Sequence, residues 1–110
     1  MVSELASCGI DLEVDNEKIL RIAPKFMSES ELQDYPSDVE KYWIWSIKEA
    51  VFKYLGYHVD FRADMRMISL EENFAQVDYS GIHGKGIFDL RLERFDEYKA
   101  ALTTNYEKKL

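Results

Sequence analysis

The segment from Val39 to Leu55 constrains the fold of this chain more than any other. Its apolar residues recur at helical spacing and fill one arc, which consists of Trp43, Ile44, Ile47, Ala50, Val51, Tyr54 and Leu55. Ser37 and Asp38 precede the segment as capping residues, and Gly56 follows it as a C-terminal stop. The sequence therefore predicts one long helix that buries a single face.

Shorter elements flank this helix on both sides. Before it we expect an alternating strand from Cys8 to Val14 and brief helices at Glu17–Ala23 and Ser28–Tyr35. After it come four short runs of β-forming residues at 65–70, 74–79, 87–93 and 98–104, with the polar, glycine-rich loop 80–86 between the second and third. This order predicts a single α+β domain over residues 1–110, with the long and short helices on one face of an antiparallel sheet.

Composition narrows the class of partner and the compartment. A net charge of -7 argues against nucleic acid, because phosphate backbones are bound by a surplus of lysine and arginine. The single Cys8 forms no internal disulfide, and no apolar run approaches the ~20 residues of a membrane span. The start of the chain has no signal-peptide pattern. We expect a soluble, cytoplasmic protein with no membrane partner.

Two carboxylates lie close together on the first predicted strand. Asp11 and Glu13 are two residues apart and leave the same strand face, ~6.5 Å apart along the chain. Ile10, Leu12 and Val14 alternate with them, so we expect the apolar side to face the core and the acids to face outward. The spacing suits two ligands of a Mg²⁺ ion, although the same pattern is typical of the solvent side of an edge strand.

The arc of the long helix opposite its apolar face carries an unusual mixture. We place Lys48, Glu49 and Lys53 there, together with Trp45 and Phe52. A simple Glu49–Lys53 ion pair, worth ~0.3–0.5 kcal/mol, leaves the two aromatic residues unexplained. Three carboxylates near two ammonium groups are what a divalent metal needs when it also holds a phosphate. The pattern therefore favours an enzyme of phosphate chemistry.

The motifs Gly9-Ile10-Asp11-Leu12-Glu13 and Trp45-Ser46-Ile47-Lys48-Glu49-Ala50-Val51-Phe52-Lys53 together resemble the signature of the 4′-phosphopantetheinyl transferase superfamily. The segment 23–32, with Phe26 ahead of Ser28-x-x-Glu31, also resembles that family. The likeness runs from about Gly9 to Thr104 and is sharpest in the first half. It implies a half-domain of the transferase fold, similar to the second half of the large two-half members.

The resemblance implies transfer of the 4′-phosphopantetheine group from coenzyme A to a serine of an acyl or peptidyl carrier protein. Asp11, Glu13 and Glu49 would then be ligands of Mg²⁺, and Lys53 would stabilise the transferred phosphoryl group or the departing 3′,5′-ADP. Lys48 would be a second phosphate contact. Glu49 or Glu13 would take the proton of the carrier serine. Such an enzyme would be of holo-acyl-carrier-protein synthase type and would serve fatty acid or polyketide biosynthesis.

The segment that grips the coenzyme phosphates in large members has no counterpart in this chain. We therefore expect a homo-oligomer, or a partner chain that completes the site. Two other functions remain open. The chain is either a non-catalytic member that binds a carrier or partner protein through the Trp45 and Phe52 helix face, or another metal-dependent phosphoryl-group enzyme that uses the same three acids.

Overall fold

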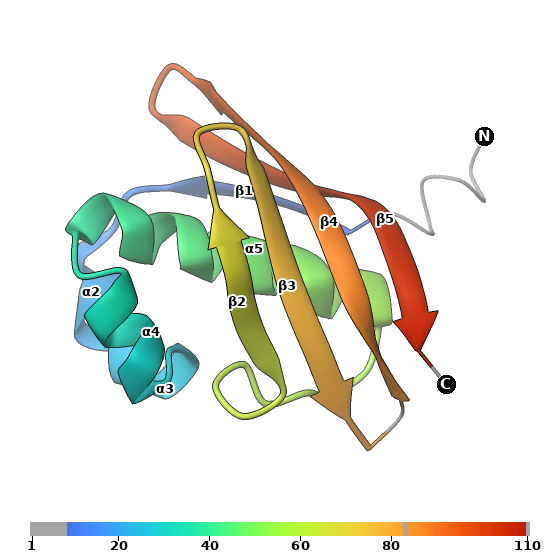
Figure 1. Cartoon of the computed structure of the whole chain (residues 1–110). Helices are drawn as coiled ribbons and strands as arrows, with labels where there is room; N and C mark the ends of the chain where they lie inside the picture. Colours follow the sequence, from blue (N-terminus) through green and yellow to red (C-terminus); the bar gives the residue numbers. More distant parts are fainter. Residues whose placement is uncertain (1–8, 83, 110) are drawn as a thin grey trace.

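The computed structural model describes residues 9–82 and 84–109 as five strands and four helices (Figure 1). The strands are β1 (Ile10–Val14), β2 (Met65–Leu70), β3 (Phe74–Gly81), β4 (Gly84–Phe95) and β5 (Tyr98–Lys109). The helices are α2 (Glu17–Arg21), α3 (Ala23–Phe26), α4 (Glu29–Asp34) and α5 (Asp38–Leu55). The predicted order of one strand, then helices, then four strands is confirmed.

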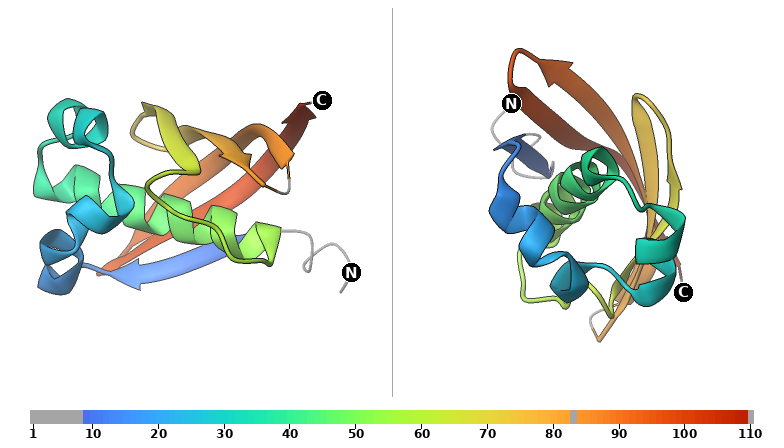
Figure 2. Two further views of the ribbon diagram at one scale, coloured as in Figure 1. Left: turned by 90° about the horizontal axis from the view of Figure 1, so that it is seen from below. Right: turned by 90° about the vertical axis from the view of Figure 1, so that its left-hand side faces the viewer.

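The strands form one antiparallel sheet in the order β1-β5-β4-β3-β2. The sheet curls around α5, and the short helices lie on the same side of it as α5 (Figure 2). Within the described chain β1 and β2 are the two edge strands. The prediction of an α+β domain with its helices on one face of an antiparallel sheet is confirmed.

Helix α5 begins and ends where the sequence indicates. The Ser37 side chain accepts a hydrogen bond from the Glu40 N–H, and the Glu40 carboxylate accepts one from the Ser37 N–H, which forms a capping box. At the other end Gly56 adopts φ 74°, a left-handed conformation that suits glycine. The same type of cap at Ser28 and Glu31 starts α4.

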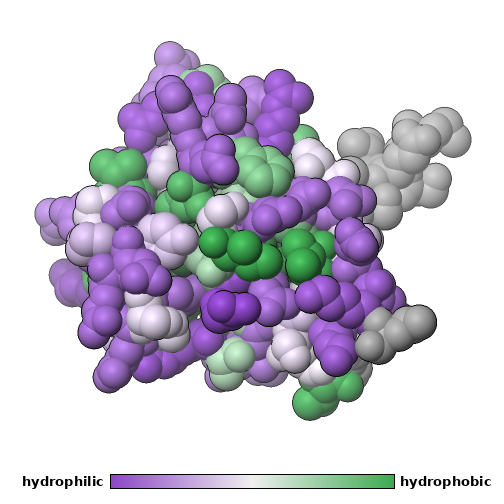
Figure 3. All heavy atoms as spheres, in the orientation of Figure 1, coloured by the Kyte–Doolittle hydropathy of each residue, from purple (hydrophilic) through white to green (hydrophobic). Residues whose placement is uncertain are grey.

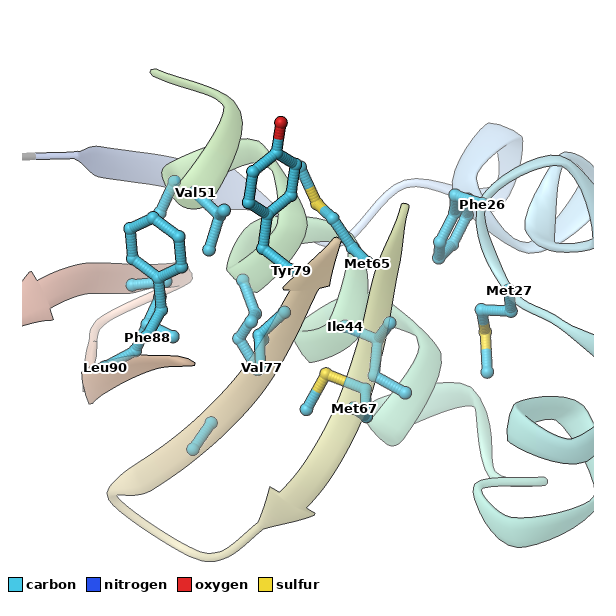
Figure 4. Close-up of a cluster of buried hydrophobic side chains, with 14 of the residues drawn as sticks. Phe26, Met27, Ile44, Val51, Met65, Met67, Val77, Tyr79, Phe88 and Leu90 are labelled. Carbon is cyan, nitrogen blue, oxygen red and sulfur yellow. The ribbon is translucent and has the colours of Figure 1, made fainter. Parts of the chain in front are cut away.

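The hydrophobic core fills the space between α5 and the sheet. From the predicted apolar arc, Ile44, Ile47, Ala50 and Val51 are fully buried. Facing side chains from the sheet and from α3 complete the cluster (Figure 4), among them Phe26, Met65, Val77, Tyr79, Phe88 and Leu90. By contrast, the surface seen in the orientation of Figure 1 is mostly hydrophilic, with a few hydrophobic groups near its middle (Figure 3).

The side of β1 that faces inward is the reverse of the expectation. Asp11 is 1% exposed against α5, whereas Ile10, Leu12 and Val14 are exposed. We call these three exposed residues the outer stripe. A strand pattern separates two faces but does not say which one is covered, and a shift of one residue exchanges them. Here α5 covers the acidic face, so the prediction that the acids face outward is wrong.

Strands β3, β4 and β5 are longer than predicted, whereas β2 has the predicted bounds. Strands β3 and β4 extend to Gly81 and Gly84, so most of the predicted loop 80–86 belongs to the hairpin itself. His83 and Cys8 lie outside the described residues. No helix in the described part of the chain is long and apolar enough to cross a membrane. The expected cytoplasmic location stays a prediction.

Candidate active site

An ion pair joins the first strand to the long helix. The Lys53 ammonium donates a hydrogen bond to Asp11 Oδ1 at 3.0 Å. The Asp11 side chain is 1% exposed and the Lys53 side chain 48% exposed, so water still reaches the cation. Because that exposure screens the charges, the pair itself stabilises the fold by about 1 kcal/mol at most. Its importance is that it fixes where β1 and α5 meet.

Glu13 and Glu49 belong to the same group of charges. Partial burial raises the pKa of Glu13, and the negative charges of Asp11 and Glu49 raise it further. Burial also raises the pKa of Glu49, and repulsion from Asp11 adds to that effect. The Lys53 charge opposes both shifts. The three predicted acids and Lys53 therefore interact electrostatically, and we call these four residues the acid cluster.

The position of Lys53 is stabilised by these same acids. A hydrogen bond to Asp11 is the main cause that raises the pKa of Lys53, and the charges of Asp11, Glu49 and Glu13 act in the same direction. The side chain is therefore an ammonium ion at neutral pH. One cation among three carboxylates leaves the cluster with a surplus of negative charge.

The acid cluster has the right chemistry for Mg²⁺, but its oxygens are not arranged as a finished site. Among residues 9–82 and 84–109 no three His, Cys, Asp or Glu side chains are placed to hold a metal ion. In the same residues Asp11 Oδ2 is buried without a hydrogen-bond partner. This oxygen lies beside two carboxyl groups, those of Glu13 and Glu49, whose pKa values are raised. A hard cation would supply the missing partner.

Gly9 allows β1 to approach α5 closely. A Cβ atom on Gly9 would lie 1.9 Å from the Ala50 carbonyl oxygen and 2.9 Å from the Tyr54 Cβ. The Gly9 N–H donates to Thr103 Oγ1 at 2.7 Å, which ties the same backbone to β5. The glycine of the first motif is thus needed so that Asp11, two residues later, reaches Lys53.

Lys48 is not where the sequence analysis placed it. Its side chain is fully buried, and its ammonium forms an ion pair with the buried Glu31 carboxylate at 2.9 Å. Burial lowers the pKa of Lys48, while the Glu31 charge and hydrogen bond act to raise it. An ammonium group held inside the protein does not contact a phosphate at the surface. The expectation that Lys48 binds phosphate is therefore corrected.

Trp45 and Phe52 are partly covered by the chain itself. The Trp45 ring lies 5.1 Å from the Phe26 ring and 5.7 Å from the Phe61 ring, and Phe52 lies 5.6 Å from Phe61. Together with Glu49, these four rings line a cavity of about 450 Å³, which we call the aromatic groove. Because Glu49 belongs to both features, the groove opens beside the acid cluster.

Sequence reasoning missed Phe61 and the part that Glu31 takes in this region. Phe61 lies in an irregular segment before β2, where no periodicity reveals which side chains turn inward. Glu31 carried a signal as the third helical residue of a capping box, but that signal indicates only a helix start. Neither pattern shows that the two residues meet Lys48.

Comparison with known proteins decides the family. The family model of the 4′-phosphopantetheinyl transferase superfamily matches residues 7–103. The chain belongs to this superfamily. A search of the curated proteins found no match. The match spans both sequence motifs, all four helices and most of the sheet, so the acid cluster lies within the part of the chain that is shared with the phosphopantetheinyl transferases.

Membership of the superfamily gives the chain a phosphopantetheinyl transferase-type function in general terms. The resemblance seen in the two motifs is thereby confirmed. The match by itself assigns no role to an individual residue and identifies no metal or substrate of this chain.

Proposed function

We propose that this chain catalyses the Mg²⁺-dependent transfer of 4′-phosphopantetheine from coenzyme A to a serine of an acyl or peptidyl carrier protein. The observation that carries the proposal is the acid cluster, in which Asp11 and Glu13 of β1 interact with Glu49 and Lys53 of α5. Membership of the superfamily supports the class of reaction. The cluster supports the presence of a metal-assisted phosphate site in this chain.

Three side chains would hold the metal. Asp11 offers its buried, unpartnered Oδ2, while Glu13 and Glu49 offer carboxylates whose mutual repulsion a cation relieves. When bound, Mg²⁺ supplies positive charge that neutralises the pyrophosphate of coenzyme A. Lys53 remains attached to Asp11 Oδ1 and keeps the strand carboxylate oriented.

The transfer breaks a phosphoanhydride bond of coenzyme A and forms a phosphate ester bond to the carrier serine. The carrier serine oxygen forms a bond to the phosphorus that bears pantetheine, and the bond from that phosphorus to the oxygen of 3′,5′-ADP breaks. The serine proton passes to Glu49 or Glu13. The half-exposed Lys53 offsets the negative charge of the phosphoryl group or of the departing nucleotide.

We further propose that a second copy of this chain, or a partner chain, completes the site. Among the described strands β1 pairs with β5 and leaves its other edge open, and the acid cluster lies on the inner side of this edge. The outer stripe adds exposed apolar surface to the same strand. A protein that packs along β1 would cover this apolar surface and bring its own side chains beside the acids.

The aromatic groove supports a second candidate function. Trp45 and Phe52 line it and remain partly exposed there, next to Glu49. A non-catalytic member of the superfamily would use this helix face to bind a carrier or partner protein without transferring a group. In that case Trp45→Ala would weaken capture of an apo acyl carrier protein, whereas Asp11→Ala would not.

The deciding experiment is a carrier-loading assay. Apo acyl carrier protein, coenzyme A and Mg²⁺ are incubated with the protein, and the carrier is weighed by mass spectrometry. We expect the mass of one phosphopantetheine group to be added, and we expect Asp11→Ala and Glu49→Ala to abolish the addition. The exposed Glu107→Gln serves as the matched control and keeps the activity.

The oligomeric state is measured on the same preparation by light scattering. If the protein binds Mg²⁺ but modifies none of several acyl and peptidyl carrier proteins, the transferase proposal is contradicted. A monomer that loads the carrier at full rate would count against the need for a second subunit.

A further inference from the structure

The Lys48 ammonium group donates hydrogen bonds to backbone carbonyl oxygens in separate segments of the chain. Besides Glu31, its ammonium donates to the Phe26 carbonyl at 2.7 Å, the Phe61 carbonyl at 2.9 Å and the Met65 carbonyl at 3.0 Å. An ammonium group has three N–H donors, so four acceptors around it leave none of them unsatisfied. One nitrogen atom on α5 thus holds the end of α3 and both ends of the segment that leads into β2.

Glu31 completes this arrangement from the other side. Its Oε1 accepts from the Ser28 N–H at 2.9 Å as well as from Lys48, and its Oε2 accepts from the Met67 N–H at 2.7 Å. The carboxylate therefore joins the start of α4 to the interior of β2. Both charged side chains are buried, so the network is screened little by water.

Two of the segments that Lys48 holds form walls of the aromatic groove. Phe26 and Phe61 both line the groove, and their rings contact Trp45 from two directions. Their carbonyl groups share the Lys48 ammonium, so the distance between these walls depends on that side chain. Lys48 is also the chain neighbour of Glu49, which lines the groove and belongs to the acid cluster.

We propose that Lys48 is a positioning residue that sets the width of the aromatic groove beside Glu49, with Glu31 as its fixed counter-charge. A buried ion pair adds little net stability compared with apolar packing, but it specifies geometry because both charges need their full set of partners. We add that the carrier protein contacts this groove during transfer, a step that rests on the proposed transferase function. That Lys48 spaces the groove walls rests on the contacts alone.

The spacing of the groove walls is measured without any catalytic turnover. Trp43→Phe leaves Trp45 as the reporter tryptophan, and quenching of its fluorescence by acrylamide reports its access to water. We expect Lys48→Met, which keeps the length of the side chain but removes the donors, to raise the quenching constant roughly twofold or more. Lys53→Met is the matched control on the same helix, and it leaves the quenching constant unchanged although it removes the cation of the acid cluster.

A second variant covers the case in which Lys48→Met does not fold. Glu31→Gln preserves the shape of the side chain and one oxygen acceptor, but it removes the counter-charge and the acceptor for Met67. An increased quenching constant in this variant, at a temperature where circular dichroism shows the protein folded, supports the proposal. An unchanged quenching constant in folded Lys48→Met or Glu31→Gln protein overturns it.

Carrier loading then separates positioning from catalysis. In an active preparation we expect Lys48→Met to raise KM for the apo carrier several-fold while kcat changes less than twofold. Loss of kcat with unchanged KM would overturn the positioning role. If the wild-type protein loads no carrier, the transferase proposal fails, and the fluorescence result still decides whether Lys48 spaces the groove walls.

Discussion

Lys53 satisfies one oxygen of the Asp11 carboxylate at 3.0 Å, while the other oxygen, Oδ2, is buried without a hydrogen-bond partner in the described part of the chain. A half-satisfied buried carboxylate is costly for folding, because the unpartnered oxygen has lost its water. Its neighbours Glu13 and Glu49 add repulsion. The cluster therefore costs stability in the absence of a cation, which is why we propose that one binds there.

Asp11→Asn should separate stability from activity. The amide keeps an acceptor for Lys53 and removes a negative charge from the cluster, so we expect the free energy of unfolding to change by no more than about 1 kcal/mol. Carrier loading should fall by about 100-fold or more, the scale of losing one preorganised electrostatic contact. Urea denaturation and the loading assay measure the two effects. A variant that stays fully active would show that Asp11 is not a metal ligand.

In the absence of metal, the contribution of Glu13 and Glu49 to the free energy of unfolding should decrease as the pH rises above 4.5, the ordinary pKa of a glutamate. The pKa values of Glu13 and Glu49 are raised in the folded protein, so the folded state holds more protons than the unfolded chain between 4.5 and the raised pKa. The contribution of these two groups is therefore most favourable at low pH and is lost as the pH rises through that interval.

The double variant Glu13→Gln/Glu49→Gln isolates this effect from the other carboxyl groups of the chain. Thermal unfolding is followed with a chelator present at pH 4 and pH 7. We expect the variant to gain more stability over the wild type at pH 7 than at pH 4. Equal differences at the two pH values would mean that the pKa values of the two glutamates are not raised in the folded protein.

Gly9→Ala should push β1 away from α5. The added Cβ would lie 1.9 Å from the Ala50 carbonyl oxygen, a backbone atom that has little room to move. We expect a loss of about 3 kcal/mol in the free energy of unfolding, at the upper end of overpacking effects, together with weaker Mg²⁺ binding by titration calorimetry.

Gly56→Ala is the control for Gly9→Ala. Its Cβ would meet no atom within 4 Å, but its φ of 74° strains an alanine, so the cost is about 1 kcal/mol. We expect Mg²⁺ binding to be unchanged in this variant. If Gly9→Ala bound the metal as well as Gly56→Ala does, close contact of β1 with α5 would not be needed for the site.

Leu12→Lys should dissociate the proposed oligomer. Leu12 is 52% exposed in the middle of the outer stripe, so a lysine there leaves the core intact but places a charge in any surface that covers β1. Light scattering is expected to show a wild-type oligomer and a monomeric variant. Ile68→Lys, on the opposite edge strand, is the matched control and keeps the oligomer. A monomeric wild type would contradict the prediction.

Periodicity and caps predicted most of the fold. The arc around Ile47, the stop at Gly56 and the capping residue Ser37 all lie where the sequence indicates, because each depends on a few neighbouring residues. The face of β1 depends instead on which element covers the strand. Alternation of Leu12 with Asp11 is equally compatible with either orientation, and only the packing of α5 selects the acidic side.

The sequence suggests that Asp11, Glu13, Glu49 and Lys53 lie together, but it does not reveal the surroundings of Lys48. The helical period did contain a signal for Lys48, since it lies four residues after Ile44 and three before Val51, on the edge of the buried arc. Because lysine is rarely buried, its residue type argues against burial more strongly than its position on the helix argues for it. Its partners Glu31 and Phe61 come from distant segments, which no local pattern connects to it.

The pairing of β1 with β5 joins the beginning and the end of the described chain. The hydrogen bond from Gly9 to Thr103 spans 94 residues, and β5 is the last strand of the chain described. Contacts of such large sequence separation must overcome the entropy of closing a long loop, so they form slowly. We therefore expect the pairing of β1 with β5 to form late in folding, whereas the contact of Asp11 with Lys53 spans only 42 residues.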